Sequence, residues 1–112
     1  MEDVKTSDQL NILFQESYKR PVLIFMHSDN DKASMRIKGM LGRAEPMEII
    51  TEPVNIINVD IYPDISKEIE KMFNVVAQIP QIIVVRNGQA VYYENQDKIF
   101  PEKIEDHILL NQ

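Results

Sequence analysis

Cysteine is absent from the 112 residues of the chain. Without a thiol the protein has no means of forming a disulfide bond, exchanging thiols and disulfides, or holding zinc through thiolates. Histidine is scarce as well, because His27 and His107 are the only two and lie far apart in the sequence. A histidine-rich metal centre is therefore excluded, and we expect neither a metal ion nor a cofactor.

Long hydrophobic runs and an excess of positive charge are also missing. No apolar stretch approaches the roughly 18 residues that span a bilayer, and the first ten residues lack the basic flank and apolar run of a signal peptide. The chain has 12 basic and 18 acidic side chains, a formal net charge of -6, which disfavours contact with nucleic acid or anionic membranes. These features predict a cytoplasmic protein that binds neither.

The composition that remains is that of a globular protein. Hydrophobic residues make up 44% of the chain and charged residues 27%, both near ordinary values for one folded unit of this length. No linker, repeat or low-complexity segment interrupts the sequence. We therefore expect residues 1–112 to form a single domain.

Helix-type and strand-type patterns alternate along the chain. Thr6 and Gln9 have the spacing of a capping box at the start of a helix, and Asn87-Gly88 is typical of a tight hairpin turn. The apolar periodicities then predict, in order, a helix from Thr6 to about Ser17, a strand at 22–26, a helix from 28–31 to about Gly42, a strand at 54–59, a helix from Tyr62 to Asn74, strands at 82–85 and 90–93, and a helix from Pro101.

The connections between these elements predict a mixed sheet. Long crossovers through helices favour parallel strands at 22–26, 54–59 and 82–85, whereas the short turn makes the last pair antiparallel. The fold class is thus α/β, a three-layer α/β/α sandwich with a terminal β-hairpin and a C-terminal helix. A doubly wound nucleotide-binding fold is the competing topology. It needs a glycine-rich phosphate loop after the first strand, and none of the three glycines lies there.

A short motif follows the first apolar strand. His27-Ser28 is followed after two residues by Asp31, and after two more by Ser34. This spacing resembles the motif of the YtxJ-like monothiol bacilliredoxins of the thioredoxin-like superfamily, in which His-Ser precedes a cysteine and then a serine. The family's cysteine falls on Asp31, so the resemblance implies the fold but not the redox activity.

A second motif, Ile79-Pro80-Gln81, precedes the hairpin and resembles the family's Ser-Pro-Gln at the same place. The resemblance implies a cis peptide bond before Pro80 and a thioredoxin-like fold in which this proline faces the start of the helix after the first strand. The backbone of Ile79 would then present partly unpaired polar groups toward Asp31. Such an edge is suited to docking an extended peptide by strand addition.

Each residue of this candidate site has a structural and a functional interpretation. Asp31 either caps a helix or presents a fixed negative charge where the relatives carry a thiolate. His27 is either a half-buried ring satisfied by a backbone carbonyl or an acid–base group paired with Asp31. Ser28 and Ser34 are more easily explained as caps than as catalysts. The predicted binding groove comprises His27, Ser28, Asp31, Ser34, Ile79 and Pro80.

The sequence therefore predicts a redox-inactive, thioredoxin-like protein that is not an oxidoreductase. We expect it to bind a protein segment or a small-molecule ligand in the groove between the Asp31 helix start and Pro80. Two alternatives stay open: an enzyme that uses His27 and Asp31 for acid–base chemistry, and a structural homodimer formed through the edge strand or a helix face.

Overall fold

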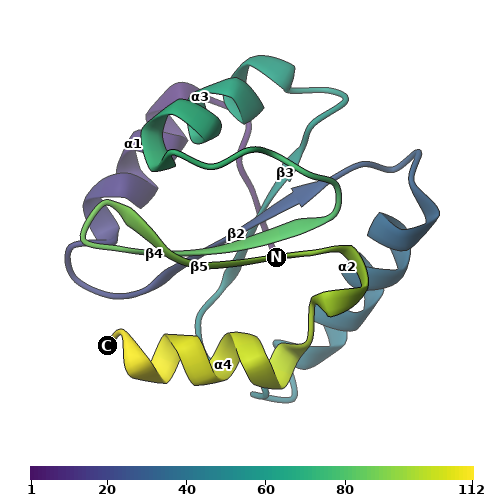
Figure 1. Ribbon diagram of the computed structural model, residues 1–112, viewed down its shortest axis with the longest axis vertical. Helices are drawn as coiled ribbons and strands as arrows, with labels where there is room; N and C mark the ends of the chain where they lie inside the picture. The colour runs from purple at the N-terminus through teal and green to yellow at the C-terminus, as the bar shows by residue number, and fades with distance from the viewer.

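The computed structural model describes all 112 residues and contains one five-stranded sheet in the order β1-β3-β2-β4-β5. Helices α1 and α3 lie on one face of the sheet, and α2 and α4 lie on the other (Figure 1). The mixed sheet between two helical layers confirms the predicted sandwich. The elements are β1 (Glu2–Asp3), α1 (Ser7–Glu16), β2 (Val22–His27), α2 (Lys32–Ala44), β3 (Val54–Asn58), α3 (Pro63–Phe73), β4 (Gln81–Arg86), β5 (Gln89–Asn95), a 3-10 helix (Gln96–Lys98) and α4 (Pro101–Leu110).

Local sequence signals set several of these boundaries. Thr6 caps α1 through the predicted capping box, with its side chain accepting from the Gln9 N–H and the Gln9 side chain accepting from the Thr6 N–H. Asn74 ends α3 in the left-handed conformation with φ of 54°. At the hairpin, Asn87 and Gly88 have φ of 54° and 74°, as a type I′ turn requires.

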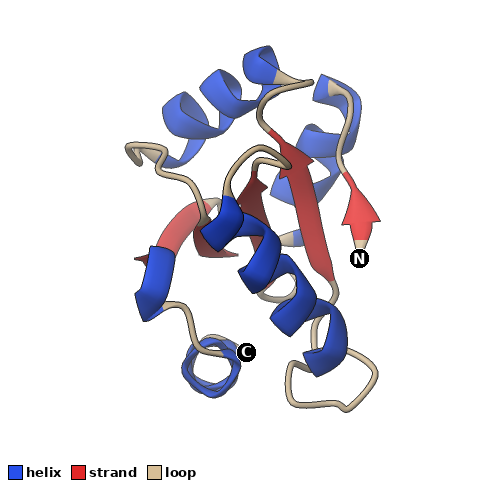
Figure 2. Ribbon diagram, turned by 90° about the vertical axis from the view of Figure 1, so that its right-hand side faces the viewer, coloured by secondary structure: helices blue, strands red, loops and turns tan.

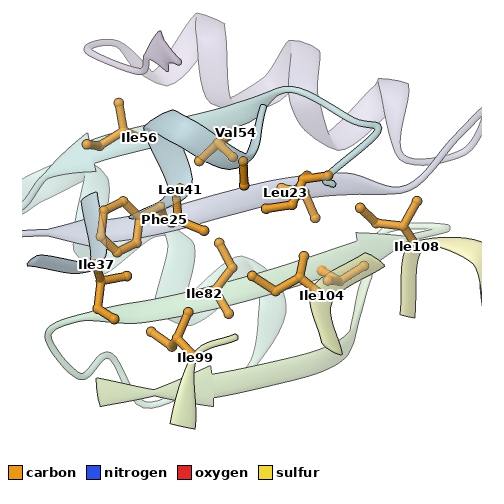
Figure 3. Packing of buried hydrophobic residues seen from close by; sticks show 13 residues of the cluster. Leu23, Phe25, Ile37, Leu41, Val54, Ile56, Ile82, Ile99, Ile104 and Ile108 are labelled. Atoms are coloured by element: carbon orange, nitrogen blue, oxygen red, sulfur yellow. The ribbon is translucent and has the colours of Figure 1, made fainter. Parts of the chain in front are cut away.

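Two hydrophobic cores fill the spaces between the layers. Side chains alternate between the faces of the central strands, so β2 and β4 contribute to both cores. In the core beneath α2 and α4, Phe25 of β2 and Ile82 of β4 lie among side chains of both helices (Figure 3). Every residue of β2 is buried, which explains its unbroken apolar run up to the final histidine.

The direction of β4 corrects the sequence-based prediction. β2 and β3 are parallel as expected, but β4 runs antiparallel to β2 rather than parallel to it. The reason lies in residues 74–80, which carry the chain from the end of α3 back to the carboxyl end of β2 before β4 begins. This segment contains no helix, and the rule for helical crossovers does not account for such an added return of the chain.

Three further details differ from the prediction. The two-residue strand β1, at the sheet edge beside the N-terminus, pairs in parallel with β3 and is extended by a hydrogen bond from the Val4 N–H to the Ile56 carbonyl of 2.9 Å (Figure 2). Helix α2 continues to Ala44, two residues beyond Gly42. The 3-10 helix after β5 was not predicted. Short elements of this kind depend on tertiary partners that no local pattern reveals.

The β4–β5 turn is tied to the end of α1. The Ser17 carbonyl accepts from the Asn87 N–H at 2.7 Å and from Arg86 Nη1 at 2.9 Å, and Ser17 Oγ accepts from the Gly88 N–H at 2.9 Å. A Cβ at Gly88 would lie 2.7 Å from Tyr18 Oη, so close approach and positive φ both require glycine here.

None of the helices combines the length and apolar character needed to cross a lipid bilayer.

Candidate functional site

The predicted site residues meet at the carboxyl ends of β2 and β3. His27 is the last residue of β2, and Asp31 is the N-cap of α2 four residues later. β2 and β4 are in register up to the pair Met26 and Gln81, and continuing that register by one step places Pro80 beside His27. The two motifs, about fifty residues apart in the sequence, therefore lie at one edge of the sheet. Crevices at such strand ends are common ligand sites in open α/β sheets.

Asp31 acts as a helix cap. Its Oδ1 accepts a hydrogen bond of 2.8 Å from the Ser34 N–H, one of the free amides in the first turn of α2. The carboxylate also lies at the positive end of the helix dipole. Its second oxygen has no hydrogen-bond partner in the chain, and the residue is partly exposed. Asp31 thus combines a structural contact with a negative charge at the surface.

His27 does not pair with Asp31, so that prediction is corrected. The ring is only 1% exposed, and its Nε2 lies 2.7 Å from Oδ1 of Asp29, while its Nδ1 lies 2.6 Å from Oγ of Ser34. Asp31 is directed instead to the helix amide described above. The hydrogen bond from His27 lowers the pKa of the exposed Asp29 carboxyl group below its usual value. The backbone carbonyl expected as the partner of His27 is likewise replaced by these two side chains.

Ser34 connects the His27 ring to the backbone of the loop after β2. The Ser34 hydroxyl accepts a hydrogen bond of 3.0 Å from the Ser28 N–H and is also hydrogen-bonded to Nδ1 of His27. The other ring nitrogen, Nε2, is hydrogen-bonded to Asp29. The order Asp29, His27, Ser34 has the connectivity of a catalytic triad, but Ser34 is fully buried and a substrate has no access to its oxygen.

A polar network that the sequence analysis missed joins the two loops after β2 and β3. Ser28 Oγ and Asn30 Nδ2 both donate to Oδ2 of Asp60. From the other side, Asn58 Nδ2 donates to Oδ2 of Asp29 at 3.0 Å. The sequence does contain a signal for this network: its residues lie at or directly after the ends of two buried strands, and parallel strands bring their carboxyl ends together. Ser28 therefore bridges the loops, beyond the capping role expected for it.

The chain before β4 presents unpaired backbone groups. The peptide bond between Ile79 and Pro80 is cis. The Pro80 carbonyl accepts from the Gln96 N–H at 2.9 Å, but the N–H and the carbonyl of Ile79 have no partner in the chain. The N–H groups of Val76 and Gln78 are also unpaired. In this stretch of four residues, here called the 76–79 segment, the Ala77 N–H donates to Glu70 and the Val76 carbonyl accepts from the Gln81 side chain, so the free donors and acceptors lie mainly at Gln78 and Ile79.

Side-chain burial alternates along the same segment. Ala77 and Ile79 are partly buried and pack against the core beneath α1 and α3, whereas Val76 and Gln78 are exposed. This alternation is that of an extended strand with one side packed and the other open. Four surface pockets, of 280 to 390 Å³, are lined by other residues, so none of them contains the candidate site.

Comparison with known proteins agrees with this geometry. The family model for monothiol bacilliredoxin BrxC matches residues 2–104. Solved structures similar to the chain include thioredoxins from Fasciola hepatica (TM-score 0.77, 15% identity, all of both chains), Malassezia sympodialis (0.74, 15%, 99% of this chain and 90% of the other) and Schistosoma mansoni (0.71, 18%, all of both chains). No curated protein matches. The structural neighbours establish the thioredoxin fold, and by its family match the chain belongs to the monothiol bacilliredoxin BrxC family, with Asp31 at the cysteine position.

Proposed function

We propose that this protein is a redox-inactive member of its family that binds an extended peptide segment along residues 76–79, between Pro80 and the Asp31 helix start. The observation that carries the proposal is the free N–H and carbonyl of Ile79, just before β4 at the carboxyl end of β2. An extended peptide would pair with these groups as an added strand, because main-chain hydrogen bonds supply affinity without a deep pocket.

The absence of a thiol supports binding in place of redox turnover. Thiol-disulfide exchange requires a thiolate to attack a disulfide sulfur, and the chain contains none. Asp31 stands at the helix start as a carboxylate that cannot form a mixed disulfide. We therefore expect no turnover in assays that measure disulfide reduction or the removal of a low-molecular-weight thiol from a mixed disulfide.

The geometry favours binding over the acid–base alternative. A general acid or base must reach the reacting group of its substrate. The His27 ring is buried, and both of its nitrogens are already hydrogen-bonded inside the protein. Its role is better explained as holding the loop after β2 against α2, which fixes the position of the edge that a peptide would meet.

The character of the edge indicates what kind of peptide would bind. Val76 is 76% exposed beside the unpaired amides, so an apolar side chain on the peptide would find an apolar contact. Asp31, Asp29 and Asp60 place negative charge at the other end of the edge. An extended peptide that carries an apolar residue and a basic residue would match both features.

The experiment begins with a displayed library of random heptapeptides selected on the purified full-length protein. A selected peptide is then added, and amide hydrogen exchange is measured residue by residue. We expect the amide of Ile79, which is free in the unbound protein, to become protected. Protection of β5 amides alone, or failure to select any saturably binding peptide, would refute the proposed groove.

A variant pair tests the charge at the groove. Asp31→Asn keeps an oxygen that can cap α2 but removes the charge, so it should weaken a peptide with a basic residue while leaving the fold intact. Asp106→Asn makes the same chemical change at an exposed position on α4 and serves as the matched control. Equal binding by the two variants would show that Asp31 does not contribute to recognition.

A further inference from the structure

A second candidate site lies at the opposite end of the central strands from Pro80. A cavity of about 330 Å³ opens between α1, the amino end of β2 and the residues just before β3. Its volume falls within the range of small-ligand sites. Because β2 is six residues long, the cavity and Pro80 are separated by roughly 20 Å at about 3.3 Å per residue. We call this space the acidic cavity, after the residues that line it.

Most of the charged side chains that line the cavity are acidic. Four carboxylates surround the cavity and face one cation, Arg20; the four are Glu2, Asp3, Glu16 and Glu52. Glu52 is largely buried, with 18% of its side chain exposed, and burial raises the pKa of its carboxyl group above the usual value. A second positive charge in the cavity would relieve part of this cost. The cavity therefore favours cationic ligands.

The chain already places a cation against this wall. The Arg20 guanidinium lies 2.9 Å from Oε2 of Glu16 and 3.6 Å from Oε2 of Glu52. The half-exposed Arg20 side chain is thus paired with two of the four carboxylates. Glu2 and Asp3 form no ion pair. Room for a second cation remains on the β1 side of the cavity.

Asn55 provides a hydrogen-bond acceptor in the lining of the acidic cavity, in addition to the carboxylates. This side chain is 92% buried on β3, in register with Glu2 on the neighbouring strand, and it lines the cavity. Its Nδ2 faces two carbonyl oxygens, those of Leu23 at 2.9 Å and Pro53 at 3.5 Å. Since both neighbours are acceptors, the amide orientation is fixed and Oδ1 must point away from them. Oδ1 accepts no hydrogen bond from the chain, so it is available to a donor in the cavity.

The arrangement selects an organic cation rather than a metal ion. No three acidic side chains are placed to hold a metal together. The wall also includes the apolar side chains of Ile12, Leu13 and Val22, which suit a hydrocarbon chain. We propose that the acidic cavity binds an alkylammonium group, with the ammonium hydrogen-bonded to Asn55 Oδ1 and paired with Glu2, the carboxylate in register with Asn55 that has no other cation. The group would belong to a free aliphatic amine or to a lysine side chain of another protein.

The test is a titration of the ¹⁵N-labelled full-length protein followed by NMR. The probes are 1,5-diaminopentane, the neutral 1,5-pentanediol, and lysine blocked at both its amino and carboxyl ends. We expect saturable shifts at the Asn55 side-chain amide and at the backbone amides of Leu13 and Val22 with an amine but not with the diol. Tighter binding of the diamine identifies a free amine as the source, and tighter binding of the blocked lysine identifies a protein side chain.

A charge-matched pair of variants makes the proposal falsifiable. Glu2→Gln removes the unpaired carboxylate from the cavity, and loss of a charge-assisted hydrogen bond should weaken the amine by about tenfold. Glu102→Gln makes the same change on α4, on the other face of the sheet, and should bind like the unmodified protein. The dispersion of the NMR spectrum verifies that both variants fold. Absence of saturable shifts at Asn55, or equal affinity in the two variants, would overturn the proposal.

Discussion

Replacing Asp31 with cysteine tests the placement of this residue at the start of α2. Asp31→Cys creates the only thiol in the chain, so every thiol signal comes from one site. The new sulfur would lie where the carboxylate now accepts from the Ser34 N–H. If the helix start retains the geometry of a thiol site, the introduced thiolate should be stabilised by that amide and by the positive end of the helix.

The size of the effect follows from the contacts. An unperturbed cysteine has a pKa of about 8.5. A hydrogen bond to a charged group contributes roughly 1.5–3 kcal/mol, which corresponds to about 1–2 pKa units at 1.36 kcal/mol per unit. The nearby carboxylates of Asp29 and Asp60 oppose the thiolate and reduce this gain. We therefore expect a thiol pKa near 7, with the thiolate about half formed at neutral pH.

The assay is the pH dependence of alkylation by iodoacetamide, checked by the ultraviolet absorbance of the thiolate. Leu109→Cys provides the control, because residue 109 is exposed near the carboxyl end of α4 and has no free helix amides beside it. Its thiol should titrate at or above the ordinary value. If both cysteines titrate alike, the helix start does not stabilise an anion and the reasoning about Asp31 fails.

Three further predictions concern stability. Asp31→Ala should lower the free energy of unfolding by about 1 kcal/mol in urea titrations, whereas Asp31→Asn should retain most of it; equal losses would contradict capping. Ser34→Ala should cost roughly 1–3 kcal/mol in the same assay, because the Ser28 N–H and His27 Nδ1 lose a buried partner; an unchanged midpoint would contradict the hydrogen-bonding scheme. Burial, with a smaller effect of Glu94, raises the pKa of Tyr92 to about 12, so stability should fall between about pH 10 and pH 12 as unfolded Tyr92 ionises first. Tyr92→Phe should remove this loss without weakening the protein at neutral pH, since the phenol oxygen is buried without a partner. Absorbance at 295 nm follows the ionisation, and an unchanged loss of stability at alkaline pH in the variant would contradict this assignment.

Strong local signals made most of the fold predictable. The capping box at Thr6, the left-handed stop at Asn74 and the Asn87-Gly88 turn each depend on a few adjacent residues, and each lies where the sequence placed it. The direction of β4 was wrong because it depends on the path of residues 74–80, which is set by packing against the core. β1 was missed because two residues are too few for a periodic pattern.

The candidate site was predictable in position but not in its pairings. The motif located His27, Asp31 and Ser34 at one helix start, which the structure confirms. His27 pairs with Asp29 because the carboxylate of Asp31 accepts a hydrogen bond from an amide at the start of α2 instead. Spacing alone does not decide this, because both aspartates lie within four residues of the histidine. The hydrogen bond between Asp60 and Ser28 could be predicted only from the pairing of β2 with β3, which brings the loops after these strands together.

The tie between Ser17 and the β4–β5 turn affects how the chain is made. The hydrogen bonds that fill the Ser17 carbonyl and hydroxyl come from residues about seventy positions later. At roughly 5–20 residues per second, a ribosome needs about 4–14 s to add that stretch. During this interval the Ser17 carbonyl has no partner, and the central strand β2 lacks β4 on one side. A nascent chain that stops before Gln81 would therefore leave the apolar β2 without β4 and open to aggregation, and stable folding must wait until most of the protein has been synthesised.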